Sequence, residues 1–254
     1  IPAYMGLIKQ CDDQLGLLLD HLEETGRMAD TMIVLTSDHG DYLGDHWMGE
    51  KDLFHNPSVK IPMIIYDPSS KADATRGTTC DALVEAIDLV PTFVEAAGGK
   101  VASNILEGRA LTPLLHGETP DWREYAISEF DYSPTPQAVK LGLEPNDCRL
   151  FMVFDGRYKM MHAMGGFRPM LFDLENDPNE FDDLAKGDAH KEVLDRLYSQ
   201  LADWGRRNAQ RVTKSDEDII SMRGRSMRKG VLPFMVDGSE VPEELTVKYR
   251  GPAK

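Results

Sequence analysis

The sequence predicts an α/β fold followed by a smaller α+β unit with an antiparallel sheet. Two continuous apolar runs, 31–36 and 61–66, lie in the first half of the chain. Such runs are typical of strands buried on both faces of a parallel sheet. Later apolar runs are shorter, and an Asp-Gly pair at 155–156 between two of them is a strong hairpin signal. We therefore expect one domain at 1–117 and a second at 118–254.

Helices are expected on either side of the two long apolar runs. Residues 3–25 are predicted to form an amphipathic helix that ends at Gly26, since glycine favours the left-handed conformation after a helix. A second helix is expected over 80–97, where Pro91 kinks or divides it and the glycine pair at 98–99 ends it. The apolar residues of the first helix recur at helical spacing: Leu7, Ile8, Cys11, Leu15, Leu18, Leu19 and Leu22.

The second unit is expected to contain short strands and one helix. The helix is predicted over 191–210. From Arg211 onward the chain is polar and rich in Gly and Pro, and we assign it no structure. Three interpretations of this tail stay open: it wraps a neighbouring subunit, it is disordered, or its basic residues form a plain solvated surface. The strand-like runs are 125–128, 149–154, 158–162 and 170–172, and the basic residues of the tail are Arg223, Arg225, Arg228 and Lys229.

Composition narrows the classes of partner. The 254 residues carry a formal net charge of -15, so nucleic acid and anionic membranes are not expected to bind, because both would repel the protein. An anionic small substrate stays compatible, since a lysine or metal reverses the field locally. No apolar run reaches the roughly 20 residues of a membrane span, and no signal peptide is recognised. Cys11, Cys80 and Cys148 are expected to be buried free thiols in a reducing compartment, the bacterial cytoplasm.

Asp38 and His39 follow the first predicted strand directly. Ligands bind at that edge of open α/β sheets, and Gly40 lets the backbone turn sharply there. A carboxylate beside an imidazole suits Zn, Mn or Fe, and with further carboxylates also Ca or Mg. An isolated Asp-His-Gly is also typical of a turn in which Asp caps the end of a strand, so both interpretations stay open at this point.

Two further candidates lie in the polar segment 37–60, which is long for a loop without structure. Lys51 is suited to stabilise charge that develops on the oxygens of a dianionic group. His46 fits a catalytic role and a structural role equally well. The carboxylates Asp41, Glu50 and Asp52 fit a solvated surface.

The motifs, in their order along the chain, resemble the sulfatase branch of the alkaline phosphatase superfamily, and most closely phosphonate monoester hydrolases and related arylsulfatases. The resemblance covers most of residues 1–185. It implies the C-terminal part of an alkaline-phosphatase-like, mostly parallel sheet with flanking helices, plus the smaller antiparallel subdomain. The motifs are Asp12 to Gly16, Thr36 to Gly40, Leu43 to His46, Lys51, Ile61-Pro62, Ile87 to Thr92, Leu171 to Leu174, Asp177 to Glu180 and Leu184-Ala185.

The resemblance implies roles for particular residues. Asp38 and His39 would ligate a divalent metal, which in this family is Mn, Ca, Mg or Zn. Lys51 would contact the oxyanion of the substrate, and His46 has no assured role and is kept as a catalytic candidate. The family nucleophile, a serine or a cysteine oxidised to formylglycine within C/S-x-P-x-R, is absent, because none of the three cysteines stands in that motif.

The resemblance therefore predicts the C-terminal part of a longer hydrolase of phosphonate, phosphate or sulfate esters, inactive by itself. Its expected partners are a small anionic ester, the missing N-terminal half and further copies of the same protein. One alternative is a non-catalytic assembly module. Another is a different branch of the superfamily, such as a phosphodiesterase, nucleotide pyrophosphatase or phosphoglycerate mutase, against which the signature at 171–185 argues.

Overall fold

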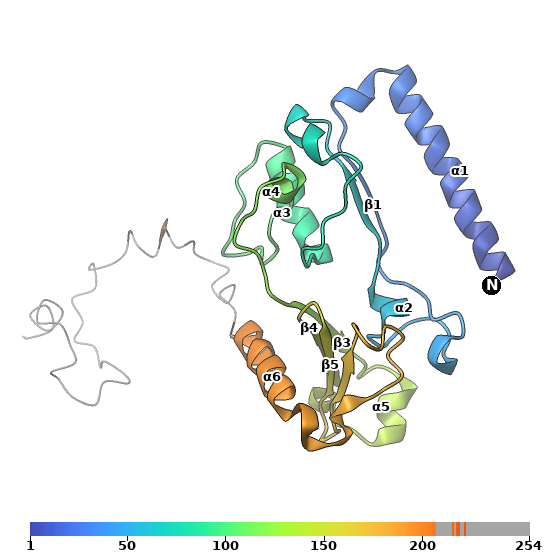
Figure 1. Ribbon diagram of the computed structural model, residues 1–254, viewed down its shortest axis with the longest axis vertical. Helices are drawn as coiled ribbons and strands as arrows, with labels where there is room; N and C mark the ends of the chain where they lie inside the picture. The colour runs from blue at the N-terminus through green and yellow to red at the C-terminus, as the bar shows by residue number, and fades with distance from the viewer. Residues whose placement is uncertain (207–214, 216, 219–220, 222–254) are drawn as a thin grey trace, which may run out of the picture.

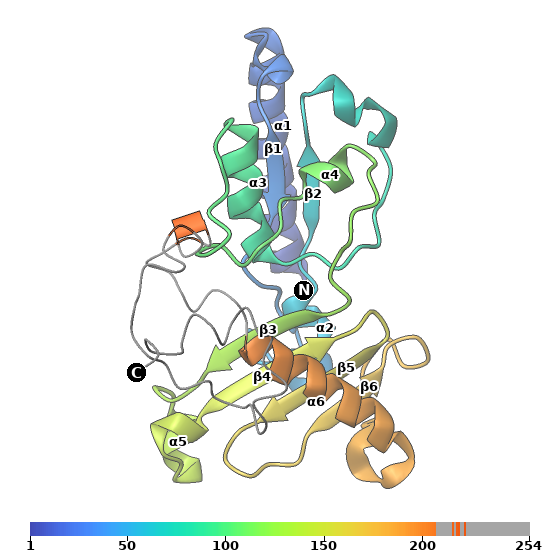
Figure 2. The same ribbon diagram turned by 90° about the vertical axis from the view of Figure 1, so that its left-hand side faces the viewer.

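A computed structural model describes residues 1–206, 215, 217–218 and 221 (Figure 1). A long helix leads into a two-stranded sheet, and a four-stranded sheet follows in the second half. In Figure 2 the first sheet with its helices lies above and the second sheet below. The helices are α1 (Pro2–Glu24), α2 (Asn56–Val59), α3 (Leu89–Ala96), α4 (Thr112–Leu115), α5 (Pro136–Leu141) and α6 (Lys191–Gly205). The strands are β1 (Ile33–Thr36), β2 (Met63–Tyr66), β3 (Ala126–Asp131), β4 (Arg149–Phe154), β5 (Tyr158–Ala163) and β6 (Met170–Asp173).

Both strands predicted in the first unit are present, but they pair with each other in antiparallel direction. Ile33 lies opposite Tyr66, and Thr36 lies opposite Met63. The parallel arrangement expected from their apolar runs is therefore wrong for this pair. A continuous apolar run indicates burial on both faces of a strand, but it carries no information about strand direction.

Helix α1 confirms the amphipathic helix predicted at the start. Gly26 follows it in the left-handed conformation, with φ of 70°. None of its residues is buried, and it stands away from the rest of the described chain (Figure 1). Its exposed apolar residues include Met5, Leu7, Ile8, Leu17 and Leu18.

Helix α3 is shorter than the predicted helix over 80–97. It begins at Leu89, after a single turn of 3-10 helix whose N-terminus is closed by reciprocal bonds between Glu85 and Asp88. Pro91 lies in the first turn, where its missing N–H costs no hydrogen bond. The proline is therefore the third residue of the helix and not an interior residue, where it was expected to kink or divide the helix.

The second sheet is an antiparallel meander in the order β3-β4-β5-β6. The predicted hairpin at 155–156 connects β4 and β5, and Gly156 has a φ of 94° that suits its residue type. Helix α6 lies across one face of the sheet (Figure 2). Leu197 of this helix packs against Val153, Met160 and Leu171. On the opposite face Phe54, from the first unit, packs against Met152, Met161 and Phe172.

Several sequence predictions have mixed outcomes. Cys148 is buried, but Cys11 and Cys80 are exposed, so the predicted burial is wrong for these two. Cys11 belongs to α1, in which no residue is fully buried. The predicted helix end at 207–210 and the basic tail lie outside the described residues, and the domain boundary at 117–118 stays a prediction.

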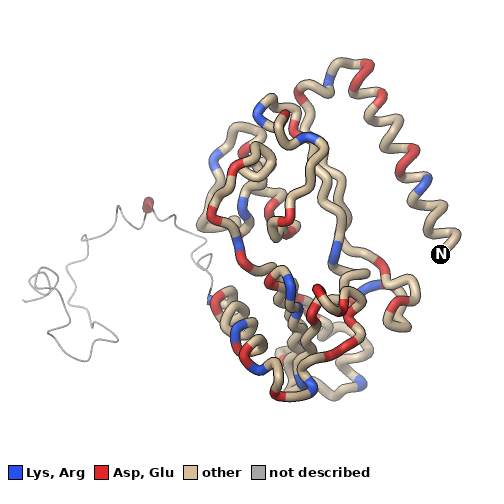
Figure 3. The backbone as a smooth tube through the Cα atoms, in the orientation of Figure 1, with Lys and Arg blue, Asp and Glu red and all other residues tan. Residues whose placement is uncertain are grey.

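Within the described part, no helix combines the length and apolarity that a membrane crossing requires. Figure 3 shows acidic and basic residues interspersed along the described part of the chain.

Candidate functional site

Local hydrogen bonds shape the turn that follows β1. The Ser37 hydroxyl donates to the carbonyl oxygen of His39 at 2.6 Å, and the His39 amide donates to Asp38 Oδ1 at 3.0 Å. Both bonds run within three consecutive residues, so the sequence itself favours this conformation. The turn holds the side chains of Asp38 and His39 next to each other.

Gly40 lets the turn lie directly against helix α2. Its amide donates to the carbonyl oxygen of Ser58 at 2.7 Å. A Cβ atom at this position would lie 2.0 Å from the carbonyl oxygen of Pro57, well inside van der Waals contact. Glycine is therefore required here for close approach of two backbone segments.

The hydrogen bonds of His39 define its tautomer. Nδ1 lies 2.7 Å from the carbonyl oxygen of Gly40, which only accepts, so Nδ1 carries the proton. Nε2 lies 2.7 Å from Lys51 Nζ, whose ammonium only donates, so Nε2 presents its lone pair. A histidine that donates from one ring nitrogen to a backbone carbonyl and has an unprotonated second nitrogen is in the form usual for a metal ligand.

The Asp38 carboxylate lies beside the same nitrogen, with Oδ2 3.5 Å from His39 Nε2. Hydrogen bonds from the backbone amide of His39 and from its own amide lower the pKa of Asp38, and the positive charge of Lys51 acts in the same direction. The carboxylate is therefore ionised at neutral pH. Both donor groups are in the forms that bind a divalent cation.

These donors fit half of a metal site. No group of three or more His, Cys, Asp or Glu side chains suited to a metal occurs among the described residues. Stable protein sites for metals such as zinc use at least three protein ligands. Asp38 and His39 therefore suit a divalent metal chemically, and a stable site would need further ligands besides these two residues.

A strained loop brings Lys51 back to the turn. The loop narrows like a hairpin, with the Tyr42 amide bonded to the Glu50 carbonyl and the Gly44 amide bonded to the Met48 carbonyl. Backbone strain of this kind is typical of functional loops and persists only where the surroundings impose it. The non-glycine residues with positive φ are Leu43, His46, Trp47, Glu50 and Asp52.

His46 lies in a different cluster from the other three candidates. Its ring stacks on His55 at 4.0 Å between centroids and lies 5.2 Å from the ring of Phe181. Tyr42 Oη lies 2.9 Å from His55 Nδ1. Burial, followed by the charges of His46 and Lys159, lowers the pKa of His55 to about 4. The structure thus brings Asp38, His39 and Lys51 together and places His46 in an aromatic packing contact.

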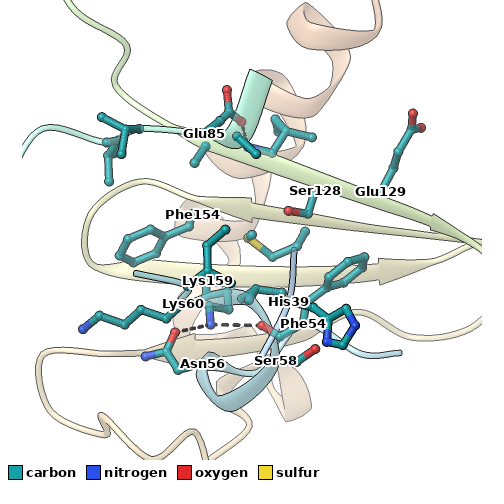
Figure 4. A pocket seen from close by; sticks show the side chains of 18 of the residues that line it. His39, Phe54, Asn56, Ser58, Lys60, Glu85, Ser128, Glu129, Phe154 and Lys159 are labelled. Carbon is teal, nitrogen blue, oxygen red and sulfur yellow. Dashed lines mark hydrogen bonds between the residues drawn. The ribbon is translucent and has the colours of Figure 1, made fainter. Parts of the chain in front are cut away.

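The turn opens into a cavity of about 1320 Å³ between the first unit and the second sheet. Asp38, His39 and Lys51 line it, whereas His46 does not. Figure 4 shows Lys159 of β5 pointing from the second sheet toward Phe54 and Asn56. Sequence reasoning missed Lys159, because only the fold places this lysine near residues about a hundred positions earlier.

Comparisons with known proteins identify the family of this chain. The family N-sulphoglucosamine sulphohydrolase, C-terminal, matches residues 44–207. The chain belongs to this family, and with it to the sulfatases of the alkaline phosphatase superfamily. The expected fold class, the C-terminal part of an alkaline-phosphatase-like protein, is confirmed.

Two relatives similar in sequence and one similar in structure illustrate the family. The multifunctional alkaline phosphatase superfamily protein PehA of Trinickia caryophylli is 38% identical over 79% of this chain and 39% of its own length. An arylsulfatase of Clostridium perfringens is 29% identical over 78% of this chain and 38% of its own length. The crystal structure of the phosphonate monoester hydrolase of Agrobacterium radiobacter has a TM-score of 0.71 and 34% identity, over 77% of this chain and 39% of that one. The chain thus spans about two fifths of the length of these relatives.

Proposed function

We propose that this chain is the C-terminal part of a metal-dependent hydrolase that cleaves phosphonate, phosphate or sulfate esters. One observation carries the proposal: Lys51 Nζ and Asp38 Oδ2 both lie within 3.5 Å of His39 Nε2. Family membership and relatives named as a phosphonate monoester hydrolase and an arylsulfatase support the reaction class.

Each of these side chains has a distinct task in this proposal. Asp38 and His39 hold the divalent metal, Mn, Ca, Mg or Zn, through a carboxylate and a neutral imidazole. When bound, the metal supplies Lewis-acid polarisation of the ester. Lys51 places an ammonium beside the metal ligands, where it stabilises negative charge on the non-bridging oxygens of the substrate.

The nucleophile and the other metal ligands belong, in this proposal, to an N-terminal part that this chain does not contain. The relatives are more than twice as long as the matched region, which supports a longer protein. Association of several copies stays a prediction, as does the identity of the metal. The remaining partner is a small anionic ester.

A metal titration of the full-length protein tests the proposal. Wild type is expected to bind a divalent metal and to hydrolyse a phenyl phosphonate monoester or an aryl sulfate. Asp38→Ala should lose both the metal and the activity, whereas Asp45→Asn, an exposed carboxylate of the same segment, should keep both. Unchanged metal content and turnover in Asp38→Ala would contradict the proposal, whereas a wild type that neither binds metal nor hydrolyses these esters would favour a non-catalytic module.

A further inference from the structure

A buried ion pair lies under the site, in the second unit. Lys159 of β5 and Glu180, in the loop after β6, are 1% and 2% exposed. Lys159 Nζ lies 2.7 Å from Glu180 Oε1. Glu180 adopts a positive φ of 58°, a conformation that costs a non-glycine residue free energy unless its surroundings require it. The backbone is thus bent to place this carboxylate.

Both members of the pair reach across to the segment that precedes helix α2. The Lys159 ammonium donates to Asn56 Oδ1 at 2.7 Å and to the Phe54 carbonyl at 3.0 Å (Figure 4). Glu180 Oε2 accepts the backbone amide of Asn56 at 2.6 Å. Three hydrogen bonds from the second unit therefore fix residues 54–56 of the first unit.

Helix α2 passes this constraint to the metal-ligand turn. It begins at Asn56, and two residues later its Ser58 carbonyl accepts the Gly40 amide at 2.7 Å. The Gly40 carbonyl in turn accepts His39 Nδ1 at 2.7 Å. Three hydrogen bonds, joined by the backbone of residues 56–58 and of Gly40, thus connect Glu180 to the imidazole of His39.

The chemistry of the pair argues against a role in packing alone. Desolvation makes buried ion pairs poor stabilisers, and apolar side chains of the same volume often do as well. Among the described residues, every hydrogen bond that these two side chains make outside the pair goes to residue 54 or residue 56. These hydrogen bonds hold residues 54–56 in place, and a pair that only stabilised the core would not need them.

We propose that Lys159 and Glu180 are positioning residues, which act through Asn56 and Gly40 to hold the Asp38–His39 turn in its ligand geometry. The geometric part concerns this chain alone, and the effect on metal binding rests on the function proposed above. Outer-shell partners of metal ligands are typically worth 10–100-fold in affinity, and an effect of this size is expected here.

The first test is hydrogen exchange of the full-length protein by mass spectrometry. Glu180→Gln removes the charge and keeps the side-chain shape, and Asn56→Ala removes the acceptor of Lys159. Both variants should speed exchange in the peptide 38–60 at least tenfold. The matched control is Arg196→Gln, which breaks the ion pair of α6 with Asp155 on the same sheet and should leave this peptide unchanged. Unchanged exchange in either variant, once folded, would overturn the proposal.

The second test measures the apparent Kd for Mn²⁺ and for Zn²⁺ well below the unfolding temperature. Glu180→Gln and Asn56→Ala should raise it at least tenfold, an effect that lower global stability alone does not produce. Equal Kd values for wild type and both variants would overturn the link to the ligands. If wild type binds no metal, the proposed function fails, and hydrogen exchange still decides whether the pair positions the turn. Should Glu180→Gln fail to fold, Asn56→Ala alone decides both tests.

Discussion

Lys51 Nζ lies 2.7 Å from His39 Nε2, on the same nitrogen that faces the Asp38 carboxylate. The Lys51 ammonium therefore lies within hydrogen-bonding distance of the nitrogen lone pair with which His39 would bind a metal. This relationship makes separate predictions for the lysine and for the metal ligands, because only the ligands donate electrons to a metal.

Lys51→Met should therefore abolish most of the turnover and leave the metal in place. Removing one preorganised donor to a developing charge costs about 10²–10³ in kcat. Metal content by mass spectrometry and kcat for a phosphonate monoester measure the two effects. Lys71→Met, at an exposed lysine far from the turn, is the control and should behave as wild type. Wild-type turnover in Lys51→Met would remove the oxyanion role.

Gly40→Ala should destabilise the protein and weaken metal binding. The added methyl group meets the Pro57 carbonyl at 2.0 Å, so the turn and α2 must separate. Overpacking of this kind costs about 1–3 kcal/mol or more, and chemical denaturation measures it. Gly49→Ala is the matched control in the same loop, since its methyl group would meet open space. Equal stability of the two variants would show that the approach of Gly40 to α2 is not tight.

Asp88→Asn should be one of the most damaging substitutions outside the site. Asp88 is fully buried and accepts the backbone amides of Glu85 and Arg109 together with the guanidinium of Arg123. Removing one charge of a buried pair costs about 3–5 kcal/mol. Denaturation by urea should show this loss, whereas Lys191→Ala, in an exposed ion pair, should leave the stability nearly unchanged. Similar losses in both variants would contradict this account of the network.

His55 should make stability depend on pH. Its pKa is about 4 in the folded protein, below the ordinary value of 6.5, because burial disfavours the imidazolium. The unfolded chain thus binds a proton first as pH falls. The contribution of neutral His55 to the free energy of unfolding is fully present above about pH 6.5. It is lost as pH decreases toward 4, by up to about 1.4 kcal/mol per pH unit. Denaturation curves between pH 7 and 4.5 measure this slope, which His55→Asn should reduce. An equal slope in the variant would assign the dependence to other groups.

Local patterns in the sequence predicted much of the fold and the site. Helix α1 and the β4–β5 hairpin follow from spacing and turn residues close together in the chain. Asp38 and His39 follow a strand directly, and the structure places both at its end, as expected. Lys51 was a candidate for contact with the substrate's oxyanion, but its proximity to His39 was not predicted, because it depends on backbone angles that residue types alone do not specify.

Contacts between distant segments were beyond the reach of these patterns. Nothing in the run around Lys159 indicates that this lysine is buried, since its partner Glu180 lies after the next strand. The direction of β1 against β2 is undetermined for a similar reason. His46 stacks on His55, a contact made only when the loop between them closes.

The hydrogen bond between Asn56 and Glu180 joins residues 124 positions apart in the chain. Contacts of such long range carry a high loop-closure entropy and form late in folding. During synthesis Glu180 leaves the ribosome long after Asp38 and His39, so its hydrogen bond to Asn56 cannot yet form when the turn emerges. We expect the site to mature only when translation has passed the second sheet, and a nascent chain that stops earlier to leave its metal ligands unordered.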